Sequence, residues 1–309
     1  MTRQQLAGLI QEVGLGHIED KLMAAARPSL RLHLHPVDED TIEIGGTKFG
    51  GGADLPPDFA WPIWQGYPES DRLRYPPGEF TRSNGALCFL AQFNLSELTG
   101  CDLGGALPSS GILYFFCAIW KMALGSDPED RDCWRVFYYQ GDGSALVRQT
   151  PPLLSQEVYR DAVLPDNNRF TCCRIDFQPE IVLPDWNDPE AYDPLRLSEE
   201  EDEQYSELFQ SSEEPDPRKY VQYGGPIHRL LGYPQIVQYS RTIEGKFAPG
   251  EHKEWHLLLQ LDTEDGIGAR WPGFVSVHWQ GGGRGYFYIP TQALAERNFD
   301  AVWVDMQCT

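Results

Sequence analysis

The stretch Leu-Cys-Phe-Leu-Ala-Gln-Phe at residues 87–93 has an echo at residues 257–261, where the chain reads Leu-Leu-Leu-Gln-Leu. Each run continues into Asn or Asp and then, after a connection, into a Gly-x-x-Tyr-Phe-aromatic motif, at residues 111–116 and 283–288. Both runs are short, apolar and closed by polar residues, which is the pattern of buried strands. The sequence therefore predicts a weak internal duplication, with two related strand pairs at the centre of one sheet system.

The two glutamines in these runs, Gln92 and Gln260, are polar residues inside apolar strands. A buried amide group needs hydrogen-bond partners, so we expect each glutamine to be structural and to bond the backbone of a neighbouring loop. The longest apolar run, residues 112–120, stops at Lys121. A bilayer span needs about 20 residues, so this run is expected to be a core strand, and no membrane partner is predicted.

Flanking segments predict further strands and a few helices. Residues 2–27 carry an apolar stripe that glycines interrupt, which indicates a helix with a break. Residues 30–35 alternate as a strand, and residues 134–139 and 145–147 are expected to pair across a glycine-rich turn. The predicted class is α+β, with a mostly antiparallel or mixed β-sheet core and peripheral helices.

The length of the chain, 309 residues, allows one large domain or two moderate ones. A chain of this size buries roughly three quarters of its unfolded surface, so a substantial core is expected. We expect a single α+β domain over residues 1–309, with pseudo-repeat halves at about 28–165 and 166–309. Residues 185–217 form an acidic insertion within the second half.

The amino-acid composition limits the cellular compartments and the classes of partner that suit this protein. The 25 Lys and Arg against 46 Asp and Glu give a formal charge of −21, which leaves no basic surplus for nucleic-acid phosphates. A basic protein is the partner that suits this charge. The first residues show no apolar signal region, and the seven cysteines are odd in number without Cys-x-x-Cys spacing. These features indicate a cytoplasmic location, with neither a disulfide framework nor a zinc site.

The acidic insertion holds thirteen acidic residues and one basic residue, a net charge of −12. Ser198 and Glu201 have capping-box spacing, so a short helix is expected to begin here. One interpretation is a solvated insertion, and the other is a docking site for a basic partner. The second interpretation nominates Glu199, Glu200, Glu201, Asp202, Glu203 and Tyr205 as binding residues.

Candidate chemistry elsewhere is sparse. His33 and His35 share one strand face, but they suit a solvent-facing surface better than a metal, and we predict neither a metal nor a cofactor. No catalytic residue is assigned. An enzyme would have to bring together His228, Arg229 and Asp262 at strand ends, as an acid–base pair within hydrogen-bond reach requires.

Several motifs in chain order resemble the YwqG-like family of bacterial proteins, a domain of unknown function. The motifs are Lys48-Phe49-Gly50-Gly51, Leu55-Pro56, Phe59-x-Trp61-Pro62, Phe89-Leu-Ala-Gln92-Phe-Asn-Leu95, Leu107-Pro-x-x-Gly111-x-Leu-x-Phe-Phe116, His228-x-Leu-Leu-Gly-Tyr-Pro234, Leu258-Leu-Gln260-Leu-Asp262, Gly285-Tyr-Phe287 and Trp303-x-Asp-x-Gln-Cys308. The resemblance implies an α+β fold and no settled activity. One departure is His278-Trp279-Gln280-Gly281, where a Trp-Gly-Asp step is expected, so a carboxylate proposed for that loop is absent.

The sequence leaves three functions open. The first is a non-enzymatic cytosolic binding protein, in its specific form an immunity protein that neutralises a basic toxin, because members of the resembled family occur beside polymorphic-toxin genes. The second is a hydrolase or small-ligand-binding enzyme with a site near His228 and Asp262. The third is a structural scaffold without a small-molecule site.

Overall fold

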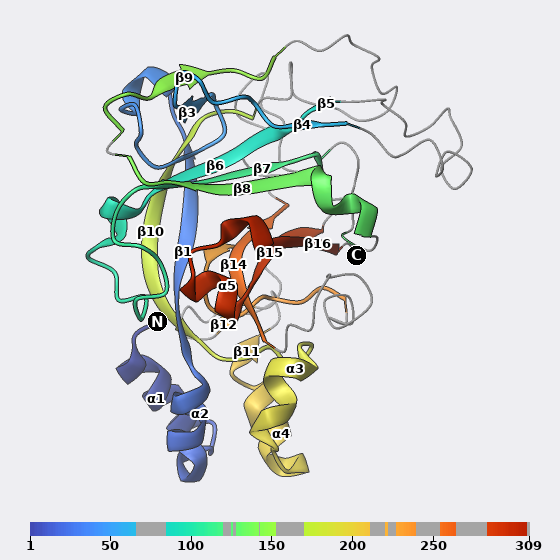
Figure 1. Cartoon of the computed structure of the whole chain (residues 1–309). Helices are drawn as coiled ribbons and strands as arrows, with labels where there is room; N and C mark the ends of the chain where they lie inside the picture. Colours follow the sequence, from blue (N-terminus) through green and yellow to red (C-terminus); the bar gives the residue numbers. More distant parts are fainter. Residues whose placement is uncertain are drawn as a thin grey trace.

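An antiparallel sheet of ten strands forms the centre of the protein (Figure 1). The computed structural model describes residues 1–65, 85–119, 125, 128–141, 143–152, 170–210, 220–221, 227–238, 254–263 and 283–307. The strands of this sheet are β1 (Arg27–Pro36), β2 (Lys48–Phe49), β6 (Cys88–Asn94), β7 (Ile112–Cys117), β8 (Trp134–Tyr139), β10 (Cys173–Val182), β13 (His228–Leu230), β14 (Trp255–Asp262), β15 (Arg284–Pro290) and β16 (Trp303–Gln307).

The order of the strands across the sheet is β16-β15-β14-β13-β1-β10-β2-β6-β7-β8. Outward from the central pair, β13 to β16 on one side correspond in sequence order to β2, β6, β7 and β8 on the other. This arrangement has the order of a pseudo-twofold repeat whose axis passes between β1 and β10. We call β2, β6, β7 and β8 the first arm of the sheet, and β13 to β16 the second arm.

The register of the two arms repeats the same details. Gln92 lies opposite Tyr114 in the first arm, and Gln260 lies opposite Tyr286 in the second. Both strand pairs carry an irregularity in the register, between Phe89 and Ala91 and between Leu257 and Leu259. The irregularity falls at the same offset from the glutamine in both arms. The predicted α+β class with a weak internal duplication is therefore confirmed.

The first strand of each half leaves its own arm. β1 pairs with β13, with Leu30 opposite Leu230, whereas β10 pairs with β2, with Cys173 opposite Phe49. The two exchanged strands then pair with each other along their whole length, from Arg27 opposite Val182 to Pro36 opposite Cys173. The central strand that each arm pairs with therefore comes from the other half of the chain.

The main hydrophobic core joins the two arms. Phe115 of β7 contacts Phe287 of β15 edge to face, with ring centroids 5.3 Å apart. Trp134 and Trp303 meet in the same geometry at 5.0 Å, and the Trp134 indole N–H donates to the Val302 carbonyl at 2.8 Å. Edge-to-face pairs are a favoured arrangement of aromatic rings. Equivalent aromatic residues thus face each other across the pseudo-twofold repeat.

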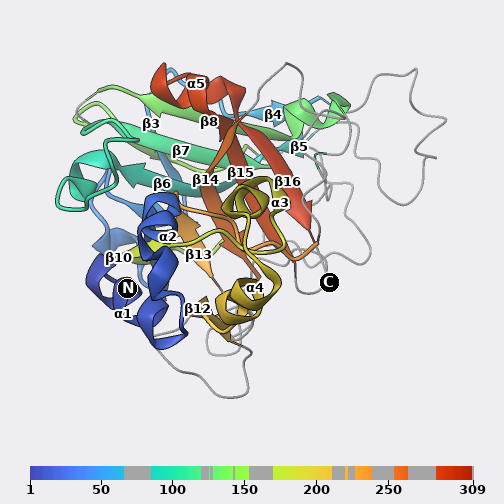
Figure 2. The ribbon, with the colours of Figure 1, turned by 90° about the horizontal axis from the view of Figure 1, so that it is seen from below.

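Helices cover one end of the sheet, and Figure 2 places α1, α2, α3 and α4 in front of it. A second hydrophobic cluster holds this end together, and it includes Leu9 of α1, Leu22 of α2 and Tyr205 of α4. The helices are α1 (Arg3–Glu12), α2 (Glu19–Ala25), α3 (Pro189–Tyr192), α4 (Glu199–Ser206) and α5 (Thr291–Ala295), with 3₁₀ turns at Gly16–Ile18, Glu39–Thr41, Leu95–Leu98, Pro128–Cys133, Asp193–Leu195 and Phe299–Ala301. None of the helices in the described part of the chain is long and apolar enough to cross a membrane.

Short strand pairs lie beside the main sheet, and one of them corrects an expectation. Residues 145–147 do not pair with 134–139, because β9 (Val147–Gln149) pairs with β3 (Ala53–Leu55) instead. An ion pair between Arg148 and Asp54, at 2.8 Å, links the two strands, and local turn patterns in the sequence do not reveal it. The other short strands are β4 (Ile63–Trp64) with β5 (Gly85–Ala86) and β11 (Phe209–Gln210) with β12 (Tyr220–Val221).

The contact between the arms generates a stability prediction. Phe115→Ala removes a buried ring and is expected to cost about 3–5 kcal/mol of unfolding free energy. In a double-mutant cycle with Phe287→Ala, the two changes should couple by about 0.5–1.5 kcal/mol, the range for an aromatic pair. The measurement is urea unfolding of the wild type, both single variants and the double variant.

A matched cycle uses Leu9→Ala, because Leu9 is buried in the second cluster away from the arms. Phe115→Ala and Leu9→Ala should be additive within about 0.5 kcal/mol. Additive effects of Phe115→Ala and Phe287→Ala would contradict the described contact.

Candidate functional site

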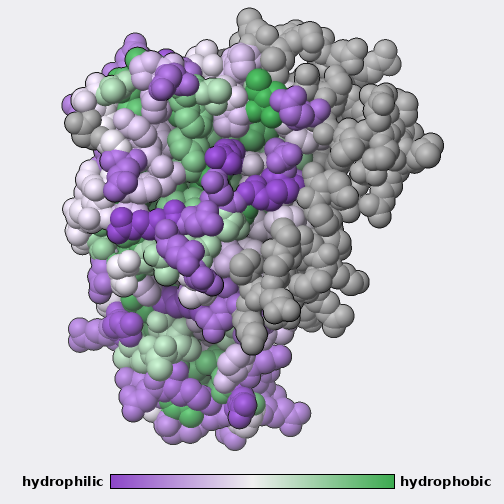
Figure 3. Space-filling view, viewed as in Figure 1, coloured by the Kyte–Doolittle hydropathy of each residue, from purple (hydrophilic) through white to green (hydrophobic). Residues whose placement is uncertain are grey.

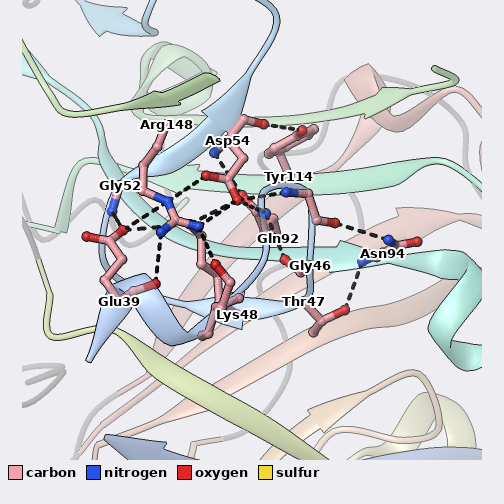
Figure 4. A network of polar contacts seen from close by, with 12 residues as sticks. Glu39, Gly46, Thr47, Lys48, Gly52, Asp54, Gln92, Asn94, Tyr114 and Arg148 are labelled. Carbon is pink, nitrogen blue, oxygen red and sulfur yellow. Dashed lines mark hydrogen bonds and ion pairs between the residues drawn. The ribbon is translucent and has the colours of Figure 1, made fainter. Parts of the chain in front are cut away.

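A buried ion cluster occupies the first arm (Figure 4). Lys48 Nζ lies 3.0 Å from Asp54 Oδ2, and Arg148 Nε lies 2.8 Å from Asp54 Oδ1. Both Lys48 and Asp54 are completely buried. Burial on its own raises the pKa of Asp54, but the hydrogen bond from Arg148 and the charge of Lys48 bring that pKa below its ordinary value. The carboxylate therefore stays charged and bound within the protein.

Gln92 connects this ion cluster to the backbone. Its Oε1 accepts a hydrogen bond from the Asp54 amide at 2.9 Å, and its Nε2 donates to the Gly46 carbonyl at 2.8 Å. Tyr114 donates its hydroxyl proton to the Asp54 carbonyl, and burial raises the pKa of Tyr114 above its ordinary value. Figure 4 shows these side chains pointing toward one another from separate strands and loops.

The second arm repeats these contacts at equivalent positions. Gln260 Oε1 accepts from the Gln235 amide at 2.9 Å, and its Nε2 donates to the Ile227 carbonyl at 2.8 Å. Tyr286 donates to the Gln235 carbonyl at 2.6 Å. The expectation that both glutamines bond loop backbone is confirmed. The duplication therefore extends from the strands to the loops that cover them.

The ionic partners differ between the two networks. Arg229 occupies the position of Lys48, because each lies opposite the glutamine of its arm. Six residues later the first network has Asp54, whereas the second has the neutral Gln235. Sequence reasoning missed this correspondence, although the equal spacing from each cation to its partner was a readable signal.

The structure brings His228 and Asp262 together, as an enzyme with a site there requires, but it uses both groups internally. His228 Nδ1 accepts a hydrogen bond from the Asp262 backbone amide at 3.1 Å. The Asp262 carboxylate accepts from Arg284 Nε at 2.8 Å, from the Ile227 amide at 2.9 Å and from the Thr263 amide at 2.8 Å. Both side chains are nearly inaccessible to solvent. The imidazole of His228 therefore bonds the backbone amide of Asp262 and not its carboxylate. The carboxylate oxygens accept hydrogen bonds from other groups of the protein.

Arg229 has a different carboxylate partner. Its Nε donates to Glu180 Oε1 at 2.8 Å, and its Nη1 donates to the Tyr233 carbonyl at 2.8 Å. Arg31 of β1 approaches the other oxygen of Glu180 at 3.3 Å. Burial raises the pKa of Glu180, but the two arginines overcome this effect and lower it. Arg229 therefore makes its contacts inside the protein, where it links β13 to β10.

The acidic residues nominated for binding lie on α4, apart from these networks. Glu199, Glu200, Asp202 and Glu203 are exposed, and hydrophilic side chains cover much of the lower end of the molecule, where α4 lies (Figure 3). Ser198 and Glu201 form the predicted capping box. Residues 211–217 of the acidic insertion and residues 278–281 lie outside the described residues.

Three of the nominated residues on α4 have internal contacts, and one of these is Asp202, whose carboxylate accepts a hydrogen bond from the Tyr192 hydroxyl. Glu201 pairs with His17 at 2.9 Å, which ties α4 to the N-terminal helices. Tyr205 is completely buried and donates its hydroxyl proton to the Pro184 carbonyl at 2.7 Å. Its ring packs in the second hydrophobic cluster, and its nomination as a binding residue stays a prediction.

The two histidines of β1 contact side chains of the neighbouring strand β10. His33 Nε2 lies 2.9 Å from Gln178 Oε1, and His35 Nε2 lies 3.2 Å from Asp176. Within the part of the chain that the structure describes, no group of three or more His, Cys, Asp or Glu residues is arranged to hold a metal ion.

Comparison with known proteins adds a family and nothing on activity. The model described as Domain of unknown function (DUF1963) matches residues 47–308. No curated protein matches the chain. The match starts after β1, so this central strand of the sheet comes from residues ahead of it.

The glutamines generate the second prediction. Gln92→Met keeps the side-chain volume but leaves the Asp54 amide and the Gly46 carbonyl without their partners. Each buried group left unpaired costs about 1–3 kcal/mol, so urea unfolding should show a large loss of stability. Gln260→Met should behave similarly, while the exposed Gln65→Met should stay within about 0.5 kcal/mol of the wild type. A fully stable Gln92→Met protein would contradict the structural role.

Asp305 generates a pH prediction. Burial raises its pKa from 3.8 to about 6, so the folded protein holds this proton more tightly than the unfolded chain does. The associated stability is present at low pH and is lost as the pH rises through about 6. Asp305→Asn removes this loss, because the amide of Asn does not ionise in this pH range. The amide oxygen can still accept the hydrogen bond that Gln307 Nε2 donates.

The measurement is urea unfolding at pH 5 and pH 7.5. Relative to the wild type, Asp305→Asn should gain about 1–2 kcal/mol more at pH 7.5 than at pH 5. The control is Asp300→Asn, because the Asp300 side chain is 61% exposed. An equal difference from the wild type at both pH values would show that Asp305 titrates normally.

Proposed function

The chain belongs to the DUF1963 family, the YwqG-like domain of unknown function, and from this premise we propose that it is a non-enzymatic binding protein. Its partner is a basic protein, which it meets through the exposed carboxylates of α4. The specific form of the proposal is a bacterial, cytoplasmic immunity protein that neutralises a basic toxin. This form rests on the toxin-gene neighbourhood of the resembled family.

The exposed charge on α4 is the observation that carries the proposal. Four carboxylates on two turns of helix, Glu199, Glu200, Asp202 and Glu203, face solvent while the buried Tyr205 fixes the helix to the protein. A dense patch of one sign steers an oppositely charged partner and accelerates association. Because α4 is anchored on its inner side, a partner meets a prearranged surface.

The polar networks support a binding role more than a catalytic one. A catalytic acid–base pair must reach a substrate and exchange a proton with it. In the pair at His228 and Asp262, the backbone occupies the His228 Nδ1 atom and three donors occupy the carboxylate. A scaffold without a partner remains the alternative that the following experiment separates.

The experiment changes the α4 acids to amides: Glu199→Gln, Glu200→Gln, Asp202→Asn and Glu203→Gln together. Glu201 is kept, because it caps the helix and pairs with His17. The matched control carries the same charge change at four exposed acids elsewhere, Asp38→Asn, Asp40→Asn, Glu43→Gln and Asp58→Asn. Both proteins and the wild type are used to capture partners by affinity from the source cells.

A basic protein should be retained by the wild type and the control and lost from the α4 variant. With that protein purified, the association rate of the α4 variant should fall roughly tenfold at low salt and lose part of its salt dependence. The melting temperature should stay nearly unchanged, because the changed groups are exposed and the amide oxygen of Asn at position 202 can still accept the hydrogen bond from Tyr192. If all three proteins capture the partner equally and associate with it at equal rates, α4 is only a solvated surface and the proposal is rejected.

A further inference from the structure

The first arm holds a primary amine and a carboxylate in contact inside the protein. Lys48 Nζ lies 3.0 Å from Asp54 Oδ2, and neither side chain has any exposed surface. Within the described part of the chain, Nζ makes no aligned hydrogen bond. Figure 4 shows Glu39 and Arg148 converging on the same two groups. Two groups held together in this way can react with each other far more readily than the same groups free in solution.

The second arm shows that the glutamine framework does not need this pair. There Arg229 stands at the position of Lys48, and the neutral Gln235 stands at the position of Asp54. Arginine stays charged in proteins and suits a permanent ion pair, whereas a buried lysine loses its proton readily and then carries a nucleophilic amine. Only the first arm therefore places a potential nucleophile against a carboxyl group.

The protonation of the pair sets the pace of any reaction. Burial lowers the pKa of Lys48, and the charge of Asp54 opposes this effect. Burial raises the pKa of Asp54, but Arg148 and Lys48 bring it below its ordinary value. The resting pair is therefore ionic. The reactive form is a minor one, in which one proton has moved from Nζ to Oδ2. A neutral pair is less costly to bury than charges, and a reaction that happens once in each molecule needs only a small population of it.

Two neighbouring side chains suit the steps of such a reaction. Arg148 Nε lies 2.8 Å from Asp54 Oδ1, where it stabilises the negative charge that develops on this oxygen when an amine attacks Cγ. Glu39 Oε1 lies 3.7 Å from Lys48 Nζ and accepts a hydrogen bond from the Gly52 amide at 2.6 Å. Contacts for proton transfer are often this long before reaction and shorten during it. Glu39 takes a proton from the attacking amine and returns it to the departing oxygen.

We propose that Lys48 and Asp54 condense after folding into an intramolecular amide, an isopeptide bond. The bond from Nζ to Cγ forms, the bond from Cγ to Oδ2 breaks, and Oδ2 leaves as water with the two protons that the ammonium group gives up. The step is neither an oxidation nor a reduction and needs no further reactant. The new bond joins β2 to β3 across the glycine loop, and it is independent of the proposed partner of α4.

The test is mass spectrometry of the denatured full-length protein, after purification and after prolonged warm incubation at neutral pH. The mass should fall below that of the sequence by one water molecule. After digestion, tandem mass spectrometry should find one cross-linked species that joins Lys48 to Asp54. An aspartate–glycine step such as Asp142-Gly143 also loses water when it forms a succinimide. Hydroxylamine cleaves the chain at that ring and leaves the isopeptide bond intact.

Three variants test the assigned roles. Lys48→Arg gives the first arm the cation of the second, keeps the charge and removes the amine, so this protein should keep the mass of its sequence. Glu39→Gln should slow bond formation at least about tenfold, because the proton carrier is lost. The matched control is Glu43→Gln, an exposed acid of the same segment, which should leave the rate unchanged.

The proposal fails on results from the wild type alone, so a folding defect in a variant cannot protect it. A wild-type protein that keeps the mass of its sequence after the incubation would overturn the proposal. A loss of water that the peptides place away from Lys48 and Asp54 would overturn it as well.

Discussion

The antiparallel pairing of β1 with β10 is the contact on which the rest of the structure depends. Each is the first strand of its half, and each leaves its own arm to pair with the arm of the other half. Because of this exchange, neither half can complete its part of the sheet alone. The edge-to-face pair of Phe115 and Phe287 then closes one core over both arms. The exchange makes the two arms interdependent.

The repeated glutamine and tyrosine positions predict the duplication, because the same strand motifs recur in both halves of the sequence at similar spacings. Local patterns could not predict pairings set by distant charges. An ion pair between Arg148 and Asp54 joins β9 to β3. Glu180 of β10 likewise joins Arg31 of β1 and Arg229 of β13. The burial of Tyr205 has a related cause, because the cluster that holds its ring includes residues of the N-terminal helices, which lie far away in the sequence.

The two arms have kept their backbone contacts and changed their charges. Gln92 and Gln260 make the same hydrogen bonds, which indicates that these bonds maintain the fold. Positions beside this framework differ, among them Asp54 against Gln235 and Thr47 against His228. In the first arm Lys48 pairs with Asp54 of the covering loop, whereas in the second arm Arg229 pairs with Glu180 of β10. The two arms therefore differ in their ionic partners while they share one framework of hydrogen bonds.

Native-state hydrogen exchange of the amides in β1 and β10 tests the exchange of strands most directly. The amides of Leu32 and Ile175, each buried in the middle of an exchanged strand, should open only with global unfolding. Their exchange free energies should therefore equal each other and match those of the slowest amides in β7 and β15. A group of amides from one half that opens together at a clearly lower free energy would show that the halves unfold separately, and would contradict the account.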